Sequence, residues 1–404
     1  MGEWKTYTLQ QLADPAKHAM ATGPFGSAIS SRHFTNRGVP VLRGSNLSVD
    51  VGHRLIEDDL VFLDESKAKE FVRSQVTQGD LVFTCWGTIG QLGIIDDMAR
   101  YDRYVVSNKQ MKMTPDRSKV NPLFLYYKLS TPQSLWAVQN MAIGSSVPGF
   151  NLTQLKSIEV DIPSIEEQQA IVAVLGALDD KIALNERIAS GADELRRNLF
   201  DQYIAEASTA IRSVPLSSTA DFINGRAFTK EATGTGRMVI RIAEINSGPS
   251  GSTVYNDIDV PDQHLARPGD VLFAWSGSLT VARWFRPEAI INQHIFKVVP
   301  KSGIPTWLAF ELTRSKLDEF KGIAADKATT MGHIQRRHLD EPVSMPAVED
   351  LPRLDAELGP LWARALVAEQ ENLALAQLRD TLLPKLMSGE LRVRDAEKMV
   401  EDAT

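Results

Sequence analysis

An internal duplication constrains the fold of this chain more than any other feature of its sequence. Residues 78–87, in which a Gly-Asp pair precedes a hydrophobic run, recur as residues 268–277, and residues 107–110 are echoed by residues 291–294. Such self-similarity indicates copies of one structural unit. The length of 404 residues also exceeds one ordinary core and fits two domains. The sequence therefore predicts two similar globular domains.

The later part of each copy keeps a constant length. Gly149 pairs with Gly332 and Arg196 pairs with Arg379, both at an offset of 183 residues. A single amphipathic helix in this region would more often pack into the core of one domain. Because a core usually tolerates insertions near the ends of its helices, duplication at constant length favours a spacer instead.

Each copy ends in a segment with a heptad seam of mostly apolar residues, interrupted by one Asn and one Arg, in alternating steps of four and three residues. The first set is Ile171, Leu175, Leu178, Ile182, Asn185, Ala189, Ala192, Arg196 and Leu199. The second set is Leu354, Leu358, Leu361, Ala365, Ala368, Asn372, Leu375, Arg379 and Leu382. The pattern predicts two long helices that pack together, at residues 163–205 and 346–392, with a C-terminal tail at 393–404. Ser164 followed by Glu167 predicts a capping box at the start of the first helix.

The remaining residues are predicted to form two α+β domains. Short β-like runs alternate with turn signals in residues 1–162 and again in residues 206–345. One amphipathic helix is expected in each domain, at about residues 122–140 and 305–320.

Composition and charge restrict the class of protein. The net charge of −7 argues against an indiscriminate binder of polyanions, because clustered Lys and Arg drive non-specific DNA affinity. The single cysteine, Cys85, excludes an intramolecular disulfide and a thiolate metal cluster, which points to a reducing compartment. No apolar run approaches the length of a membrane span, and the first residues lack the hydrophobic stretch of a signal peptide. We therefore expect a cytoplasmic protein with no membrane partner.

Gly- and Ser-rich loops in both copies carry side chains that suit DNA recognition. Glycine lets the backbone approach a ligand, and Ser, Asn, Gln and Arg supply donors and acceptors for base edges and phosphates. One such loop is more often a plain turn, but repetition at matching places favours binding. The candidate DNA-binding residues of the first copy are Ser27, Arg43, Ser45, Asn46, Trp86, Lys109, Gln110, Ser145 and Ser146. Those of the second copy are Arg241, Trp275, Ser276, Gln293, His294, Lys327, Thr330 and His333.

Motifs for catalysis, nucleotide binding and metal binding are missing from the sequence. No Gly-x-Gly-x-x-Gly follows a strand pattern, and no Walker-type loop is present. Residues 121–124 look like the Asn-Pro-Pro-Phe element of amino-methyltransferases, but a helix start with proline in its first turn explains them better. His333 and His338 lack the cysteines or carboxylates that would complete a metal site. We expect no catalytic residue, no metal and no cofactor bound by this chain.

The assembled pattern resembles the specificity subunits of type I restriction-modification systems. The resemblance rests on Gly-Pro-Phe-Gly-Ser at 23–27, the Gly-Asp turns that begin at Gly79 and Gly269, residues 162–168, and residues 382–391. Their order and duplication make the match specific over nearly the whole chain. The second copy departs from the pattern because it has Ala347 in place of Ser164 and Pro352 early in the helix, so its helix is expected to start later.

The resemblance implies two target-recognition domains separated by two long antiparallel coiled-coil helices, arranged as a pseudo-twofold internal repeat. Each domain would read one half of a bipartite site on double-stranded DNA. The helices of this family dock two modification (methyltransferase) subunits, which bind S-adenosylmethionine and methylate adenine, and restriction (motor-nuclease) subunits join them. The chain itself would be a non-catalytic specificity subunit. From the residues alone, a protein-interaction scaffold and a stand-alone DNA-binding regulator remain as alternatives.

Overall fold

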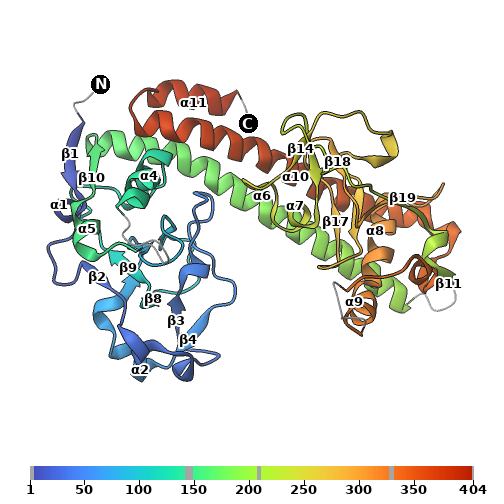
Figure 1. The fold of residues 1–404 in the computed structure, drawn as a ribbon, viewed down its shortest axis with the longest axis horizontal. Coiled ribbons are helices and arrows are strands. Elements are labelled where there is room, and N and C mark those ends of the chain that lie inside the picture. Colours follow the sequence, from blue (N-terminus) through green and yellow to red (C-terminus); the bar gives the residue numbers. More distant parts are fainter. Residues whose placement is uncertain (1–3, 142–148, 207–210, 327–331, 403–404) are drawn as a thin grey trace. The chain divides into compact units, whose positions relative to one another are not determined.

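The computed structural model describes residues 4–141, 149–206, 211–326 and 332–402. The chain forms two compact units (Figure 1). Unit 1 comprises residues 1–180 and 375–404, and unit 2 comprises residues 181–374. Each unit has a globular α+β part, and the long helices α6 (Ile165–Glu206) and α10 (Leu351–Met387) contribute residues to both units.

The globular parts consist of short strands and helices. The strands of unit 1 are β1 (Lys5–Thr8), β2 (Met20–Thr22), β3 (Val39–Leu42), β4 (Val61–Leu63), β5 (Gln75–Thr77), β6 (Leu81–Thr84), β7 (Leu92–Ile94), β8 (Arg103–Val106), β9 (Gln110–Met113) and β10 (Glu159–Ile162). Its shorter helices are α1 (Leu9–Leu12), α2 (Glu65–Lys69), α3 (Pro122–Leu129), α4 (Pro132–Asn140), α5 (Leu152–Ser157) and α11 (Val393–Glu401). The strands of unit 2 are β11 (Ile211–Pro215), β12 (Ala220–Asn224), β13 (Arg237–Ile240), β14 (Tyr255–Asn256), β15 (Leu265–Ala266), β16 (Val271–Ala274), β17 (Thr280–Arg283), β18 (Ala289–Ile291), β19 (Ile295–Pro300) and β20 (Pro342–Pro346). Its shorter helices are α7 (Ile242–Ser247), α8 (Thr306–Ser315) and α9 (Leu317–Asp326).

The two globular parts have the same strand connectivity. In unit 1 one sheet has the strand order β2-β9-β6-β7 and another has β4-β3-β8-β5, and unit 2 repeats them as β12-β19-β16-β17 and β14-β13-β18-β15. The second sheet of each unit contains one parallel pair, β3 with β8 and β13 with β18. A separate antiparallel pair joins β1 to β10 and β11 to β20. The predicted internal repeat of two α+β domains is therefore confirmed in the fold.

The repeated Gly-Asp pair shapes the turn before the central strands β6 and β16. Gly79 and Gly269 have φ angles of 96° and 94°, which a residue with a Cβ atom rarely adopts. The aspartate after each glycine accepts a hydrogen bond from the backbone N–H three residues earlier, at 2.9 Å in unit 1 and 2.7 Å in unit 2. It also pairs with a buried lysine of the neighbouring strand, Lys112 in unit 1 and Lys297 in unit 2. This motif is therefore structural.

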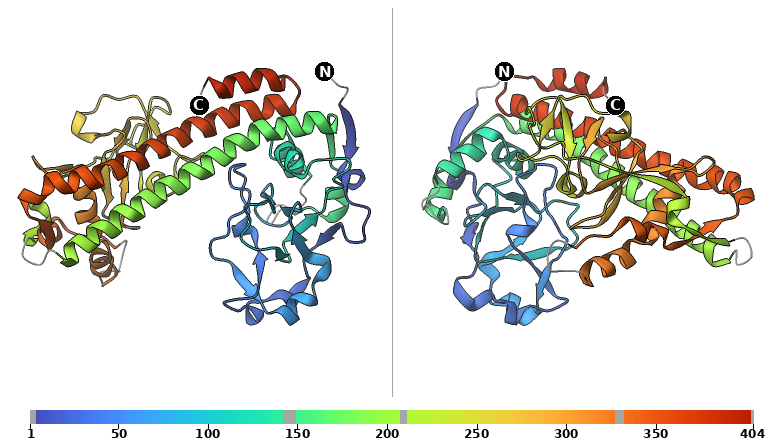
Figure 2. Two further views of the ribbon diagram at one scale, coloured as in Figure 1. Left: turned by 180° about the vertical axis from the view of Figure 1, so that it is seen from behind. Right: turned by 45° about the vertical axis from the view of Figure 1, so that its right-hand side comes forward.

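Most residues of the predicted heptad seams are buried where α6 and α10 pack together, and the rest are partly buried (Figure 2). In unit 2, Ala189 forms an apolar cluster with Ala365 and Ala368. Nearby, Asn372 Nδ2 donates a hydrogen bond to the carbonyl oxygen of Ile182 at 3.1 Å. Because later residues of α6 contact earlier residues of α10, the two helices run antiparallel.

The helices differ from their predicted bounds at several ends. Ser164 precedes α6, and its Oγ accepts a hydrogen bond from the backbone N–H of the third helical residue at 3.4 Å, as an N-cap does. The second long helix begins after a 3-10 turn at Val348–Asp350, and it ends at Met387 rather than at residue 392. The tail predicted at 393–404 contains helix α11.

Each globular part has two consecutive helices where the sequence predicted one. Residues 122–140 form α3 and α4, and the segment expected at 305–320 forms α8 and the first turn of α9. Pro132 has no N–H with which to continue α3. The Thr131 hydroxyl accepts a hydrogen bond from Ser134 N at 3.3 Å and so caps α4. The single-helix prediction failed because the periodicity continues across this break.

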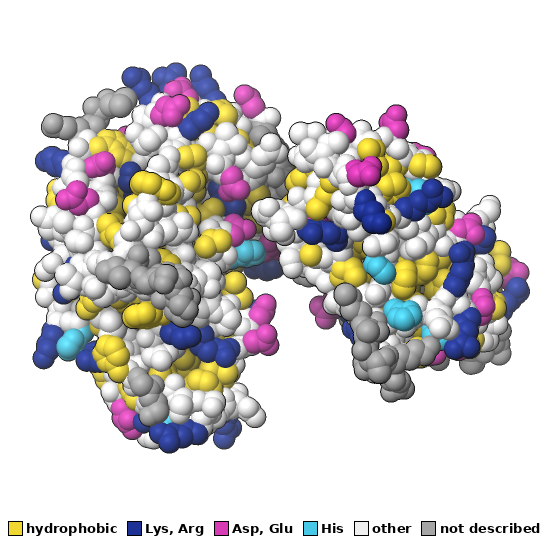
Figure 3. Space-filling view, viewed as in Figure 1, with side chains coloured by type: hydrophobic (Ala, Val, Ile, Leu, Met, Phe, Trp, Pro, Cys, Tyr) yellow, Lys and Arg dark blue, Asp and Glu magenta, His cyan; other side chains and the backbone are white. Residues whose placement is uncertain are grey.

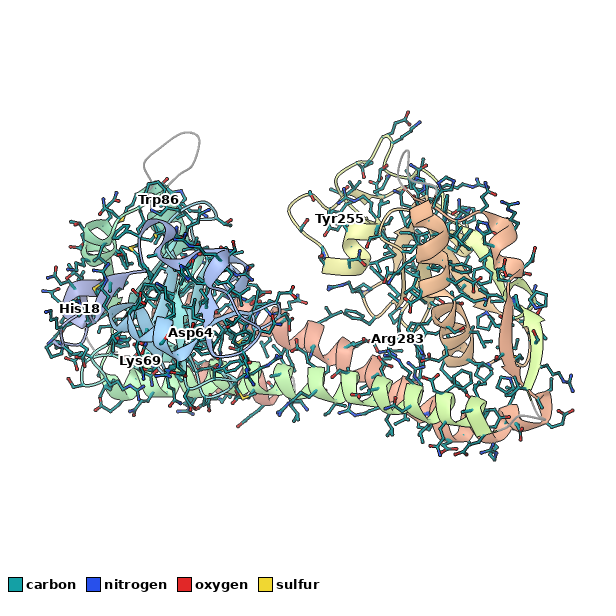
Figure 4. All side chains as sticks on the ribbon, turned by 90° about the horizontal axis from the view of Figure 1, so that it is seen from below. His18, Asp64, Lys69, Trp86, Tyr255 and Arg283 are labelled. Atoms are coloured by element: carbon teal, nitrogen blue, oxygen red, sulfur yellow. The ribbon has the colours of Figure 1, made fainter. Side chains whose placement is uncertain are left out.

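A buried arginine joins the globular part of unit 2 to the helix pair. Arg196 of α6 forms an ion pair with Glu311 of α8, and both side chains are 0% exposed. The Arg196 guanidinium lies 5.3 Å from the ring centre of Phe310 and 5.2 Å from that of Trp362. Arg283 lies 4.4 Å from the Trp362 ring centre, and Figure 4 shows it beside the long helices. Charged and aromatic groups therefore fix α8 and β17 against the helices of this unit.

Unit 1 has a corresponding joint with different chemistry. Arg379, which follows Arg196 at the repeat offset, pairs with Asp179 at 3.1 Å. Asp179 also accepts hydrogen bonds from Arg54 at 3.0 Å and from the Tyr127 hydroxyl at 2.5 Å. Burial and the charge of Asp179 both raise the pKa of Tyr127, so its hydroxyl stays protonated and donates. The two copies thus keep the seam arginine but surround it with different partners.

Candidate nucleic-acid interface

A surface hollow in unit 1 brings together five of the residues that the sequence predicts to bind DNA. The hollow has a volume of about 540 Å³, and its lining includes Arg43, Ser45, Trp86, Lys109 and Gln110. These residues come from the loop after β3, the loop after β6, the turn between β8 and β9, and the first position of β9. Figure 4 shows Trp86 at the end of the globular part away from the unit's helix pair. Segments that are distant in sequence therefore converge on one surface.

The side chains of this hollow divide into exposed and buried groups. Trp86 is 49% exposed, and Ser45 and Lys109 are also exposed. Gln110 is fully buried, and its Oε1 accepts a hydrogen bond from the Ser107 hydroxyl. Its Nε2 has no hydrogen-bond partner among the described residues. Contrary to the expectation from sequence, Gln110 shapes the floor of the hollow and does not present its amide at the surface.

Two further candidates, Asn46 and Ser276, are buried as well. Asn46 Nδ2 donates to the carbonyl oxygen of Ile56 at 2.9 Å, and its Oδ1 accepts from Arg43 N at 3.0 Å. Its side chain closes a turn, which is a common role of Asn. Ser276 is 7% exposed and forms an isolated antiparallel bridge with His333. Neither side chain belongs to the exposed surface that the sequence predicted for it.

Arg43 and Arg241 occupy equivalent positions, and hydrogen bonds hold both within their loops. Each stands at the N-cap of a short helical turn. Arg43 Nη2 donates to the carbonyl oxygen of Asp59 at 2.6 Å, and Arg241 Nη2 donates to that of Ser252 at 2.8 Å. Burial opposes the charged form of Glu244, but hydrogen bonds from Arg241 outweigh it and lower the pKa of Glu244. The two arginines therefore stabilise the loops of the candidate surfaces.

Unit 2 presents an aromatic cluster at the equivalent loops. Trp275 Nε1 donates to Asn224 Oδ1 at 2.8 Å. The centre of a Trp275 ring lies 5.0 Å from the ring centre of His294 and 6.4 Å from that of His333. Gln293, His294 and His333 are exposed. His294 has a φ angle of 72°, which is uncommon for a residue other than glycine.

Hydrogen bonds correct the alignment of the two copies by one residue in the turn after β8 and β18. Cys85 N donates to the carbonyl oxygen of Lys109 at 2.9 Å, and Trp275 N donates to that of His294 at 3.0 Å. Lys109 is therefore equivalent to His294, whereas the sequence comparison pairs Gln110 with His294. The exposed positions of this turn match after the correction.

A second correction concerns Gly149, which the sequence comparison pairs with Gly332. In the structure Gly149 forms an isolated β-bridge with Trp86, and His333 forms one with Ser276. Because Trp86 and Ser276 are equivalent, Gly149 is equivalent to His333. The offset is thus 184 here, and it becomes 183 only after the helical turn that follows. That turn is an α-helix in unit 1 (α5) and a 3-10 helix in unit 2, and a 3-10 helix has fewer residues per turn.

Four candidate residues lie outside the described residues, and two residues that were not candidates line the hollow of unit 1. Outside the described residues lie Ser145, Ser146, Lys327 and Thr330. For Ser27 only the backbone is described, in a 3-10 turn. Thr88 and Asn108 line the hollow of unit 1, although the sequence did not single them out. Asn108 is exposed in the same repeated turn as Gln293, and a correct alignment of the copies would have identified it.

Three further properties of the described residues concern metal binding, membrane spans and charge. Among them, no group of three His, Cys, Asp or Glu side chains is arranged to hold a metal ion. Within the same ranges, the structure contains no helix long and apolar enough to cross a membrane. Burial raises the pKa of the Cys85 thiol to about 11, which keeps it protonated near neutral pH. On the face shown in Figure 3, Lys and Arg side chains are interspersed with carboxylates on each unit.

Known proteins share both the sequence pattern and the fold. Residues 28–191 match the family described as the type I restriction modification DNA specificity domain. The type I restriction enzyme MjaIX specificity subunit of Methanocaldococcus jannaschii is 22% identical over 371 residues, covering 82% of this chain and 82% of that protein. The HindI specificity subunit of Haemophilus influenzae is 25% identical over 210 residues, covering 51% of this chain and 42% of that protein. The crystal structure of a type I system S subunit from M. genitalium is 15% identical, covers 95% of this chain and 96% of that chain, and has a TM-score of 0.59, which indicates the same fold.

Proposed function

Because the chain belongs to the family of type I restriction-modification specificity subunits, we propose that it recognises double-stranded DNA, with each unit reading one half of a bipartite site. The observation that supports this proposal most directly is that equivalent loops of the two units bear different exposed polar and aromatic side chains. Lys109 in unit 1 corresponds to His294 in unit 2, and Asn108 corresponds to Gln293. Equivalent positions with different donors and acceptors suit two different half-sites.

The charge of the chain agrees with a reader that acts within a larger assembly. Affinity for DNA comes largely from Lys and Arg that neutralise phosphates, whereas specificity comes from contacts to base edges. A chain with a net charge of −7 supplies few surplus cations. We infer that partner subunits provide much of the phosphate contact while this chain provides the base contacts.

The chain is a non-catalytic specificity subunit of a multisubunit methyltransferase and endonuclease. In our proposal, adenine methylation depends on S-adenosylmethionine bound by the partner modification subunits, and restriction subunits carry the motor and nuclease functions. This chain would bind no cofactor of its own.

The proposal predicts that damage to one surface affects one half-site only. Replacing Trp86 and Lys109 with alanine should weaken discrimination in one half-site, and Gln293→Ala with His294→Asn should weaken it in the other. Each lost base contact costs roughly 1–3 kcal/mol, or about 5- to 150-fold. Asparagine tolerates the backbone conformation of His294 better than alanine does. The measurement is methylation by the complex with modification subunits, using DNA libraries in which one half-site at a time is randomised.

Lys69→Ala is the matched control for loss of a positive charge, because Lys69 is exposed and Figure 4 shows it far from Trp86 within unit 1. It should leave both half-sites unchanged. Equal loss at both half-sites in the folded surface variants would contradict independent reading. If the wild-type complex protects no DNA at all, the scaffold alternative gains support.

The long helices carry an exposed apolar position that repeats between the copies, and we infer that modification subunits dock there. Leu184 and Leu195 of α6 are 43% and 49% exposed, and a separation of eleven residues places them on one side of an α-helix. Val367 of α10, 54% exposed, follows Leu184 at the offset of 183. Two equivalent apolar positions fit two copies of one partner.

Introducing a charge at these positions should weaken assembly. The Leu184→Glu and Val367→Glu double variant should bind fewer than two modification subunits at concentrations that saturate the wild type, because the carboxylates lose their water on docking. Native mass spectrometry measures the stoichiometry. Ser190→Glu is the matched control, because this exposed residue of α6 lies about 120° around the helix from Leu184. Unchanged binding of two subunits by the folded double variant would place the docking surface elsewhere.

A further inference from the structure

One pair of facing residues differs between the units in a reciprocal way. In unit 1 the loop after β6 forms an isolated antiparallel bridge from Trp86 to Gly149, and in unit 2 the equivalent bridge joins Ser276 to His333. The hydrogen bonds beside the bridge are equivalent as well. Phe150 N donates to the Cys85 carbonyl oxygen at 3.1 Å, and the corresponding bond in unit 2 measures 3.2 Å. The backbone frame is thus the same in both units while the side chains differ.

The sizes of the two facing side chains are complementary. A Cβ atom on residue 149 would lie 2.6 Å from Cε3 of Trp86, which is far closer than atoms can approach. The φ angle of Gly149 lies outside the left-handed region, and the three atoms nearest to a side chain there all belong to the Trp86 indole ring. In unit 2 the small residue is Ser276, and the large one is His333 on the opposite segment. Each unit therefore has one large and one small member, in opposite order.

The large ring therefore belongs to the loop after β6 in unit 1, whereas in unit 2 it belongs to the segment that faces the equivalent loop. In unit 1 the half-exposed indole stands at the rim of the hollow that Lys109 also lines. In unit 2 the exposed imidazole of His333 packs edge-on against Trp275. An indole offers an apolar face and one N–H donor, whereas an imidazole offers ring nitrogens that donate and accept. The two units therefore present different chemistry at one position of the same frame.

We propose that the facing positions 86/149 and 276/333 are a specificity-determining pair, whose large member selects the base-pair edges that its unit accepts in its half-site. This proposal rests on the proposed function. The small member has a positioning role, because it leaves the space in which the ring of the large member lies.

The first test exchanges the pair. Trp86→Ser combined with Gly149→His gives unit 1 the residues of unit 2, and Ser276→Trp combined with His333→Gly does the reverse. With modification subunits and half-site libraries, the first variant should change base preference about tenfold or more in the half-site of unit 1 and leave the other half-site unchanged. The reverse variant should affect only the other half-site. Parental preferences in both folded variants would overturn the proposal.

The second test separates contact from positioning and needs no exchange. Gly149→Ala adds no polar group, so it acts on DNA only by displacing Trp86. It should therefore weaken discrimination in the half-site of unit 1 in the wild-type background and have no further effect when Trp86 is already serine. Equal effects in the two backgrounds would overturn the positioning role of residue 149. Trp86→Phe keeps a ring and should retain most of the parental preference.

The outcomes also distinguish failure of the pair from failure of the proposed function. A wild-type complex that methylates a bipartite site, together with variants that keep both half-site preferences, overturns the pair alone. A wild-type complex without any sequence-dependent methylation overturns both. If an exchange variant does not fold, the comparison of Gly149→Ala with Trp86→Ser still decides the question.

Discussion

Replacing Glu311 with alanine is expected to lower the free energy of unfolding of unit 2 by about 3 kcal/mol, because it removes a buried carboxylate partner from the buried Arg196 guanidinium. Glu311 and Arg196 are both 0% exposed and form an ion pair. Arg314 Nε also donates to Glu311 Oε2 at 2.6 Å. Arg196 Nη2 keeps its hydrogen bond to Asp193 Oδ1 at 2.9 Å, but Nη1 loses its acceptor and Nε has no hydrogen-bond partner among the described residues. Denaturant unfolding measures the loss, and hydrogen exchange in α8 assigns it to unit 2.

Two further variants make this prediction specific to the buried pair. Glu319→Ala removes an exposed partner of Lys316 in the same region and should cost less than about 1 kcal/mol. Arg196→Met combined with Glu311→Leu removes both charges and should recover most of the stability, because apolar residues of similar volume replace buried ion pairs well. A Glu311→Ala variant within 1 kcal/mol of the wild type would show that water reaches Arg196 once the carboxylate is gone.

The long helices and the duplication could be predicted because their signals are periodic. A heptad seam of 3.5-residue spacing is repeated many times along the sequence, and burial of Leu175, Leu178, Leu358 and Leu382 follows from it. Even the polar seam residue Arg196 is buried as the pattern requires. Such redundancy tolerates local exceptions, which is why the predicted segments contain most of both long helices although the ends of α10 differ from the prediction.

The candidate surface was predicted less completely because a polar side chain in a loop can either stabilise the loop itself or face a ligand. Asn46 and Gln110 are polar, yet Asn46 closes a turn and Gln110 forms a floor, while exposed Asn108 beside them was not singled out. Propensity does not separate a side chain that satisfies its own backbone from one that faces a ligand. The one-residue error that pairs Gln110 with His294 has a similar cause, because only backbone hydrogen bonds fix the register of dissimilar loops.

Lengthening both long helices by one heptad is expected to increase the preferred spacing between half-sites by about three base pairs, if these helices act as the ruler of the bipartite site. Seven residues add roughly 10 Å to an α-helix, and DNA rises about 3.4 Å per base pair. Insertion near Asn185 and Ala368 preserves the heptad seams, so the two helices should still pack against each other. Both helices contribute residues to both units, so each must be extended.

Methylation of a library of spacer lengths by the complex with modification subunits measures the effect, and the base preferences within each half-site should not change. Three base pairs also rotate one half-site by roughly 100° about the DNA axis. Lower affinity is therefore expected, because the duplex or the helices must twist to compensate. A matched variant with four inserted residues in each helix introduces a stutter, which turns the seam by about 50° and unwinds it locally, so its helices should pack less stably than those of the seven-residue variant. If the seven-residue variant stays folded and active but keeps the parental spacer optimum, the helices do not set the distance between the half-sites.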